Sequence, residues 1–463
     1  MTSAATATTP RSDRRLSVGL ISTAVAGAVI GSVGAPLITP VATGFHVSLA
    51  AAQWTLTITL LTGAIAGPVL GRLGGGPHRR TAILTTLGSV TAGGVLTVLP
   101  LPFAVLLIGR ALQGLGIAVV ALLMSVARTH LPKARSASTI AALSVASTVG
   151  IGVGYPFIAF VDQLAGLRAA YGAGLALSAA ALVIAWRTVP AEAPGPRPRV
   201  DAAGAILLAI GTLGVLVTIA EPAIWQPAWV AGALLVGAAI ILAVWAFVEL
   251  RTTTPLVDLR LLAHGPVLRA NLAMLVAGVG LYLLFSIVTR YVQTPADAGY
   301  GFALPGVAAG AALIPFSLFG FAAGTLLPRF VARVGARGTY ASAIVIAVLA
   351  AVLFAVGSES LVVVLVAIAV LGFAVGGVSA VMPQLVLVGA SDTETASVLS
   401  INQIVRSVGF SAGSATAGFL LAAATPSGTV LPSPSGYTAT ALWAIPPLVA
   451  SALVIVIGRP PSG

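Results

Sequence analysis

The chain consists of long apolar runs separated by short stretches rich in polar residues, glycine or proline. The runs hold about 20 residues or more, the length that a helix needs to cross roughly 30 Å of hydrocarbon. We therefore expect an all-α polytopic membrane protein with about 14 transmembrane helices, including a short turn between Pro100 and Pro102 that separates two spans. The predicted spans are residues 16–43, 50–73, 81–100, 102–128, 137–161, 168–188, 202–220, 227–249, 267–291, 303–328, 338–357, 360–388, 394–424 and 437–458.

The composition also indicates a membrane protein. Apolar residues make up 58% of the chain and charged residues only 7%, whereas soluble domains carry roughly 25% charged residues. Cysteine is absent, which excludes disulfides, iron–sulfur clusters and thiolate zinc sites. The four histidines lie in separate predicted loops or helix ends, so we expect no metal site and no cofactor. The chain also has no Gly-Lys-Ser/Thr sequence with which a P-loop would hold ATP.

Basic residues are distributed unevenly among the predicted loops. If the N-terminus is inside, only Arg168 and Arg290 fall in segments on the outer side. The positive-inside rule then predicts that both termini lie in the cytoplasm, in a multi-pass protein of the cytoplasmic membrane. The net charge of +12 is thus a topology signal, and we expect the lipid bilayer rather than nucleic acid as a partner.

Segments near the two ends of the chain resemble each other at offsets of 257 to 259 residues. Chance similarity among alanine-rich helices is the alternative explanation, but the order and spacing of the matches favour a repeat. The repeat predicts an N-terminal six-helix bundle (1–188), a linker with two inserted helices (189–262) and a C-terminal six-helix bundle (263–463). The matching segments are 67–72 with 324–329, 114 and 124 with 372 and 382, and 148–154 with 407–413.

Two motifs in the N-terminal part resemble those of the major facilitator superfamily. Arg110-Ala-Leu-Gln-Gly-Leu-Gly116 is similar to the family pattern R-x-x-Q-G-x-G. The loop Gly71-Arg-Leu-Gly-Gly-Gly-Pro-His-Arg-Arg80 is similar to G-x-L-a-D-r-x-G-r-k, with Gly75 in the acidic position and His78 in place of the second glycine.

The segment Gly150-Ile-Gly-Val-Gly-Tyr-Pro156 is similar to the antiporter signature G-x-x-x-G-P of this family, with Tyr155 inserted before the proline. Together with the arrangement of six, two and six spans, the chain resembles the fourteen-span drug:proton antiporter branch of multidrug efflux type. It differs in span one, where no acidic residue lies between Ala24 and Phe45, although that branch usually carries an aspartate there.

An ionisable side chain inside a transmembrane helix is costly, so it is a functional candidate by default. Arg110 lies about 12 Å into its span at 1.5 Å per residue, and the resemblance implies a role in proton coupling. A structural arginine bonded to helix carbonyls is the alternative. Asp162 and Glu221 end spans five and seven. They are further proton-coupling candidates, with solvated helix ends as the alternative.

Other predicted site residues fall into three groups. Polar side chains within spans could line a substrate cavity or form interhelical hydrogen bonds, and Arg406 could instead snorkel to the surface. Small residues and a proline in span five could form a hinge or a seal, and basic loops could form a cytoplasmic latch or mark topology alone. The candidates are Gln113, Asn271, Asn402, Gln403 and Arg406 for the cavity; Gly150, Gly154 and Pro156 for the hinge; and Gly71, Arg72, Arg79, Arg80 and Arg329 for the latch.

These features predict a secondary transporter that exports a lipophilic organic compound or drug by alternating access, with proton-coupled antiport. The alternative is a facilitator or importer of a small solute without proton antiport. An enzyme would need clustered acids, histidines or a nucleophile at membrane depth, and the sequence shows none. We expect a small lipophilic substrate and protons as partners, and a monomer.

Overall fold

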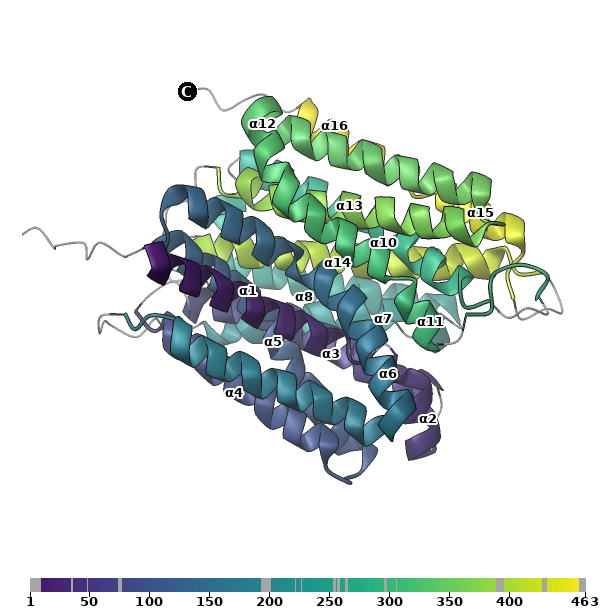
Figure 1. Ribbon diagram of the computed structural model, residues 1–463, viewed down its shortest axis with the longest axis horizontal. Helices are drawn as coiled ribbons and strands as arrows, with labels where there is room; N and C mark the ends of the chain where they lie inside the picture. The colour runs from purple at the N-terminus through teal and green to yellow at the C-terminus, as the bar shows by residue number, and fades with distance from the viewer. Residues whose placement is uncertain are drawn as a thin grey trace, which may run out of the picture.

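The computed structural model describes residues 10–34, 36–47, 49–73, 77–192, 201–220, 222–225, 227–252, 255, 259–262, 265–294, 298–304, 306–388, 395–426 and 431–457. Every regular element in these residues is helical (Figure 1). The helices are α1 (Pro10–Ser32), α2 (Ile38–Phe45), α3 (Leu49–Leu73), α4 (Arg79–Val98), α5 (Phe103–His130), α6 (Lys133–Thr188), α7 (Ala202–Ala220), η1 (Pro222–Trp225), α8 (Ala228–Arg251), α9 (Leu259–Leu262), α10 (Gly265–Tyr291), α11 (Gly306–Ala311), α12 (Ile314–Gly357), α13 (Leu361–Val386), α14 (Thr395–Ala423), α15 (Pro434–Leu442) and α16 (Ile445–Val456).

The all-α polytopic fold predicted from the sequence is confirmed, and 11 helices in the described residues are long and apolar enough to cross a membrane. The turn predicted near Pro100 separates α4 from α5. Three predicted spans are broken: span one into α1 and α2, span ten between α11 and α12, and span fourteen into α15 and α16.

Two helix junctions are tight enough to leave no loop. Spans five and six form the single element α6, which turns at Gly166 with φ 80°, and spans ten and eleven meet inside α12 at Gly335 with φ 75°. Both angles lie in the left-handed region, which glycine adopts without the steric penalty of a side chain. A glycine at each position therefore permits the reversal of chain direction.

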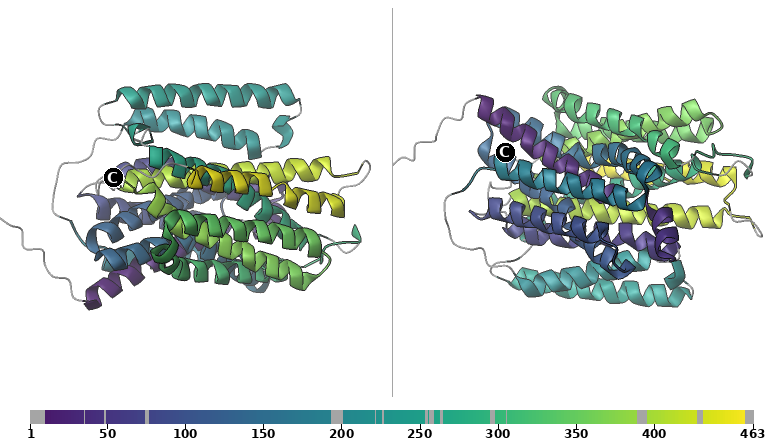
Figure 2. Two further views of the ribbon diagram at one scale, coloured as in Figure 1. Left: turned by 90° about the horizontal axis from the view of Figure 1, so that it is seen from above. Right: turned by 60° about the horizontal axis from the view of Figure 1, so that its bottom comes forward.

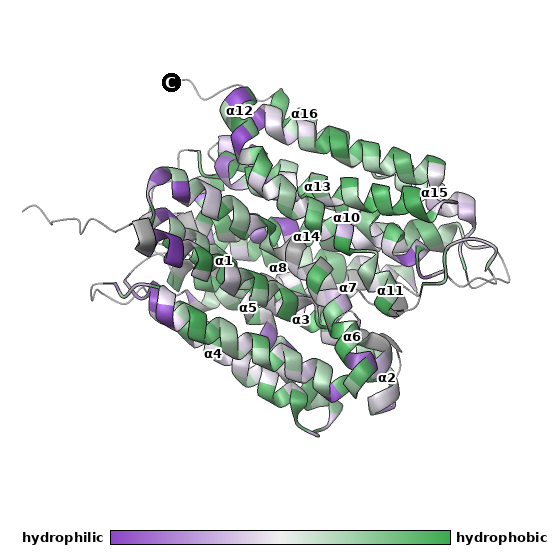
Figure 3. Ribbon diagram, in the orientation of Figure 1, coloured by the Kyte–Doolittle hydropathy of each residue, from purple (hydrophilic) through white to green (hydrophobic). Residues whose placement is uncertain are grey.

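The long helices run side by side, and α1 begins at the same end of the bundle at which α16 ends (Figures 1 and 2). Hydrophilic residues gather at this end, while the middle of the bundle is mainly apolar (Figure 3). We call the end at which α1 begins the basic end, because Arg14 and Arg15 lie in the first turns of α1 and Arg135 forms an ion pair of 3.7 Å with Asp13 of the same helix. Large apolar side chains such as Trp229 and Val356 are 73% and 84% exposed, as expected for a surface that faces lipid.

Helices from the first and last parts of the chain pack in matching ways. Helix α1 packs along α6 and α3 along α5, while α10 packs along α14 and α12 along α13. The inserted helices α7 and α8 pack on each other, and α7 also contacts α3 and α14; Figure 2 shows this pair at the edge of the bundle. The exact domain limits remain a prediction.

Close contacts between helices occur at repeat-related glycines. A methyl group on Gly114 would overlap the carbonyl oxygen of Thr59, and one on Gly372 would overlap the carbonyl oxygen of Phe316. Each pair joins the second and fourth spans of one predicted six-helix bundle, residues 1–188 or 263–463, and we call these two parts of the chain the six-helix groups. The same spacing in both groups agrees with the repeat, because small residues are what allow helix backbones to approach closely.

Candidate functional site

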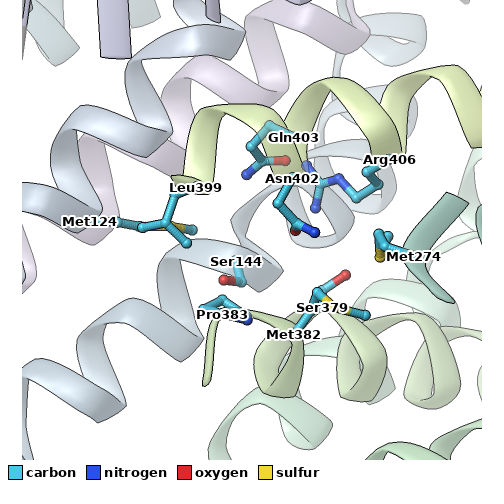
Figure 4. A pocket seen from close by; sticks show the side chains of 10 residues that line it. All are labelled: Met124, Ser144, Met274, Ser379, Met382, Pro383, Leu399, Asn402, Gln403 and Arg406. Atoms are coloured by element: carbon cyan, nitrogen blue, oxygen red, sulfur yellow. The ribbon is translucent and has the colours of Figure 1, made fainter. Parts of the chain in front are cut away.

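The main candidate site is a small cavity between the two six-helix groups (Figure 4). Its free volume is about 10 Å³, which is room for roughly one water molecule. An organic molecule needs far more space, and we refer to this arrangement as the closed conformation. The lining residues are Met124 (α5), Ser144 (α6), Met274 (α10), Ser379, Met382 and Pro383 (α13), and Leu399, Asn402, Gln403 and Arg406 (α14).

The cavity is lined by residues that the repeat relates to one another. Met124 corresponds to Met382 at the repeat offset, and Ser144 corresponds to Gln403. Each pair therefore contributes one side chain from each six-helix group to the same cavity. Binding sites at the interface between internal repeats are typical of secondary transporters.

A second space of about 20 Å³ lies next to the first, between α3, α5 and α14. Gly63 and Gly67 form one side of it, and Gln403 and Ile404 form the other. Because Gln403 lines both spaces, a modest separation of α14 from α3 and α5 would join them.

Three of the five predicted cavity residues, Asn402, Gln403 and Arg406, line the main cavity. Asn271 lies behind it, and its side-chain oxygen accepts a hydrogen bond of 3.1 Å from Nδ2 of Asn402. Asn271 donates in turn to the carbonyl oxygen of Val267 at 2.9 Å. The asparagine pair thus links α10 to α14, which is the interhelical role that polar side chains often play in membranes.

Arg406 is half-buried in α14, and Figure 4 shows its guanidinium extending beside Asn402. Its guanidinium carbon lies 5.8 Å from the centre of the Phe410 ring, a cation–π contact. Within the described residues no hydrogen bond or ion pair is found for this side chain, and none of the residues lining the cavity is acidic.

Arg110 lies away from the cavity and is fully buried in α5. Its guanidinium donates to the carbonyl oxygens of Thr55 at 3.0 Å, Ile30 at 3.2 Å and Gly31 at 3.4 Å. It also donates to Oε1 of Gln113 at 2.6 Å. Gln113, the remaining predicted cavity residue, therefore bonds to Arg110. The side chain therefore ties α5 to α1 and α3.

Asp162 is half-buried, four residues before the turn of α6 at Gly166. Tyr171 follows the turn and interacts electrostatically with both Asp162 and Arg110. The Tyr171 hydroxyl is buried and has no hydrogen-bond partner among the described residues. Two proton-coupling candidates thus act electrostatically on one tyrosine, which the sequence did not single out. Glu221 lies outside the described residues.

The predicted hinge residues make two different contacts. A methyl group on Gly150 would lie 2.8 Å from the carbonyl carbon of Ala28 in α1, and Gly154 is packed against the same helix. Pro156 instead lies against Gly310 of α11, in the other six-helix group. The approach is so close that a methyl group on Gly310 would be 3.0 Å from Pro156 Cα.

Tyr155, the residue inserted in the antiporter-like motif, forms a side-chain hydrogen bond with Gln293 at the end of α10. This bond and the Pro156 contact both join the two groups near the end of the bundle opposite the basic end. The motif alone could not indicate these contacts, because the partner residues lie in another part of the chain.

Two of the predicted latch residues, Arg79 and Arg80, bond within the N-terminal part of the chain. Arg79 forms an ion pair of 3.1 Å with Glu192 and donates to Thr129 Oγ1 at 3.1 Å. Arg80 donates to the carbonyl oxygen of Trp186 at 2.9 Å. These contacts tie the start of α4 to α5 and to the end of α6.

Gly71 and Arg329 make no comparable contact in the described part of the chain. Gly71 is buried, Arg329 is exposed and the side chain of Arg72 lies outside the described residues. Nor does any group of three or more His, Asp or Glu side chains in the described ranges form a possible metal site.

Comparisons with known proteins agree with this architecture. The profile of the Major Facilitator Superfamily matches residues 19–414. A multidrug resistance protein B homolog of Mycobacterium tuberculosis is 27% identical over 298 residues, covering 60% of this chain and 54% of the relative. An uncharacterised MFS-type transporter of that organism is 26% identical over 247 residues, covering 51% of this chain and 35% of the relative.

Among solved structures, the human organic anion transporter MFSD10 matches with a TM-score of 0.67, covering 97% of this chain and 100% of that chain. The sequence identity is 15%, so this likeness shows the fold alone. The chain matches about a third to a half of the length of the curated mycobacterial relatives.

Proposed function

Because the chain belongs to the major facilitator superfamily, a family of secondary transporters rather than enzymes, we propose that it exports a lipophilic organic compound by alternating access. The main support is the cavity lined by repeat-related residues from both groups, Met124 with Met382 and Ser144 with Gln403. A site on the pseudo-symmetry axis can be approached from either end of the bundle. We further propose that the basic end faces the cytoplasm, in agreement with the positive-inside rule.

Alternating access requires a closure on each side of the cavity. On the outer side, Tyr155 bonds to Gln293 and Pro156 contacts Gly310. Toward the basic end, Ala141 and Val145 of α6 pack with Ala380 of α13. Opening one closure while keeping the other would expose the cavity to one side of the membrane at a time.

The proposed energy source is the proton motive force. Arg110, Asp162 and Glu221 are the proposed coupling residues, and the support for the first two is their shared electrostatic interaction with the buried Tyr171. Through Tyr171, a change of protonation at Asp162 would alter the electrostatic surroundings of Arg110, and with them the packing of α1, α3 and α5 around it.

A facilitator without proton antiport is the second candidate function. It is favoured by one observation, namely that none of the described residues lining the cavity is a carboxylate. Proton antiporters need a group that exchanges a proton near the substrate path, and carboxylates are the side chains whose pKa burial can raise toward neutral pH.

Accumulation of a lipophilic fluorescent dye in cells expressing the protein tests the proposed function. We expect lower accumulation than in cells that carry an Asn402→Leu, Gln403→Leu double variant, in which the cavity walls lose their amides. A protonophore should restore accumulation to the level of that variant. An equal rate of dye loss with and without the protonophore, and only down a dye gradient, would establish the facilitator instead.

A further inference from the structure

Two arginines lie at membrane depth, and their surroundings differ. The four hydrogen bonds of Arg110 to Thr55, Ile30, Gly31 and Gln113 satisfy its guanidinium inside the protein. Arg406 lines the cavity, and a cation–π contact with Phe410 is its only interaction found in the described residues. Of these two cations, Arg406 is therefore the one available to a ligand.

The position of Arg406 makes its charge costly. It lies 11 residues from the start of α14, about 16 Å along the helix at 1.5 Å per residue, inside a stretch that is long and apolar enough to cross a membrane. An unpaired charge at this depth is unfavourable unless a counter-ion or water compensates it. No acid lines the cavity in the described part of the chain, so a bound anion would supply the missing partner.

A series of aromatic rings leads away from Arg406 within the C-terminal group. The ring of Phe410 stacks on Tyr282 with 5.0 Å between centroids, Tyr282 lies 5.4 Å from Phe285, and Phe285 lies 5.1 Å from Phe316. On the other side of the cavity, Met124 and Met382 offer polarisable apolar side chains that adapt to irregular ligands.

We infer that the transported compound is a lipophilic organic anion, whose negative group pairs with Arg406 and whose aromatic or aliphatic body packs on Phe410 and the two methionines. This inference rests on the proposed export function and names its substrate class. It also fits the absence of acids from span one, because the membrane potential, which is the electrical part of the proton motive force and is negative inside, drives an anion outward.

The test uses the full chain, reconstituted in vesicles preloaded with either of two xanthene dyes, anionic fluorescein or cationic rhodamine 123. Four proteins are compared: the natural chain, Arg406→Gln, Gln403→Glu and the control Arg333→Gln, which removes one exposed positive charge. Gln403→Glu places a carboxylate three residues before Arg406, within reach on the same helix face. This variant keeps the side-chain size and neutralises the site.

We expect the natural chain and Arg333→Gln to release fluorescein faster than protein-free vesicles. Arg406→Gln and Gln403→Glu should each lower that rate about 10-fold or more, as expected for loss of a charge-assisted contact. Release of rhodamine 123 by Gln403→Glu should rise, which would also show that this variant is folded.

The outcomes separate the two levels of the proposal. Release of rhodamine 123 but not fluorescein by the natural chain would overturn the anion inference and leave export of lipophilic compounds standing. Unchanged fluorescein release by both Arg406→Gln and Gln403→Glu would overturn the role of Arg406. Release of neither dye by the natural chain would contradict the proposed function itself, and the inference with it.

Discussion

Gly324 of α12 lies against Val145 of α6, so closely that a methyl group on Gly324 would be 2.8 Å from Val145 Cγ2. The repeat-related residues, Gly67 of α3 and Ile404 of α14, also face each other, with 3.8 Å between such a methyl group and Ile404 Cγ1. The interface between the two six-helix groups is therefore built twice from corresponding positions, and it is tighter on the side of Gly324.

This asymmetry predicts different effects of one added methyl group. Gly324→Ala must displace Val145, and overpacking of this kind costs about 1–3 kcal/mol, so we expect it to disfavour the closed conformation. Gly67→Ala is the matched control, because its methyl group would make an ordinary contact.

The chain has no cysteine, so Ser379→Cys can report access to the cavity through its labelling by a membrane-impermeant maleimide. We expect faster labelling with Gly324→Ala; equal labelling of both variants would contradict the asymmetry.

The four hydrogen bonds of Arg110 predict that replacing it lowers the stability of the protein as well as its transport activity. Arg110→Gln would leave the carbonyl-lined site without its guanidinium, and we expect a cost of about 2–4 kcal/mol, in the range for a broken buried polar network. Thermal unfolding of the purified protein measures this, with exposed Arg290→Gln as the control. An unchanged unfolding temperature with transport abolished would instead assign Arg110 to coupling alone.

The bond between Asn271 and Asn402 predicts an energetic coupling of about 0.6–1.7 kcal/mol, the range measured for hydrogen bonds between membrane helices. A double-mutant cycle of Asn271→Ala and Asn402→Ala, followed by unfolding, gives this value. Because only Asn402 lines the cavity, its replacement should also raise the KM for substrate, whereas Asn271→Ala should change mainly stability. Equal KM effects of the two variants would argue against this division of roles.

The charge of the substrate predicts which part of the proton motive force drives export. Each elementary charge gains about 2.3 kcal/mol per 100 mV of membrane potential. In cells at neutral pH, nigericin dissipates the pH gradient, and valinomycin with high external potassium dissipates the potential. We expect export of fluorescein to persist with nigericin and to stop with valinomycin. The reverse pattern would indicate electroneutral proton exchange, and would direct attention to Asp162 and Tyr171.

Much of the architecture could be predicted from the sequence. The spans follow from the length of the apolar runs, because a helix must satisfy its own backbone hydrogen bonds in lipid and must be long enough to cross it. The repeat could be recognised from Gly114 with Gly372 because close contacts between helices tolerate only small residues. The breaks within spans one, ten and fourteen each lie beside a proline, namely Pro36, Pro315 and Pro446. This signal was visible in the sequence, but the uninterrupted apolar runs favoured continuous spans.

The site could be predicted only in part, because lipid and the protein interior are both apolar and the sequence does not show which face of a helix is turned inward. Arg406 and Gln403 stood out as polar residues in a span, but Met124 and Met382 looked like any apolar residues. In the sequence, Arg110 was a candidate for proton coupling and Arg406 for the cavity, but both were simply arginines inside apolar spans. The packing of α1 and α3 around Arg110 surrounds one guanidinium with carbonyl oxygens, whereas the junction between the two groups leaves the other facing the cavity. That difference depends on contacts between residues distant in the chain, and therefore only the tertiary structure decided it.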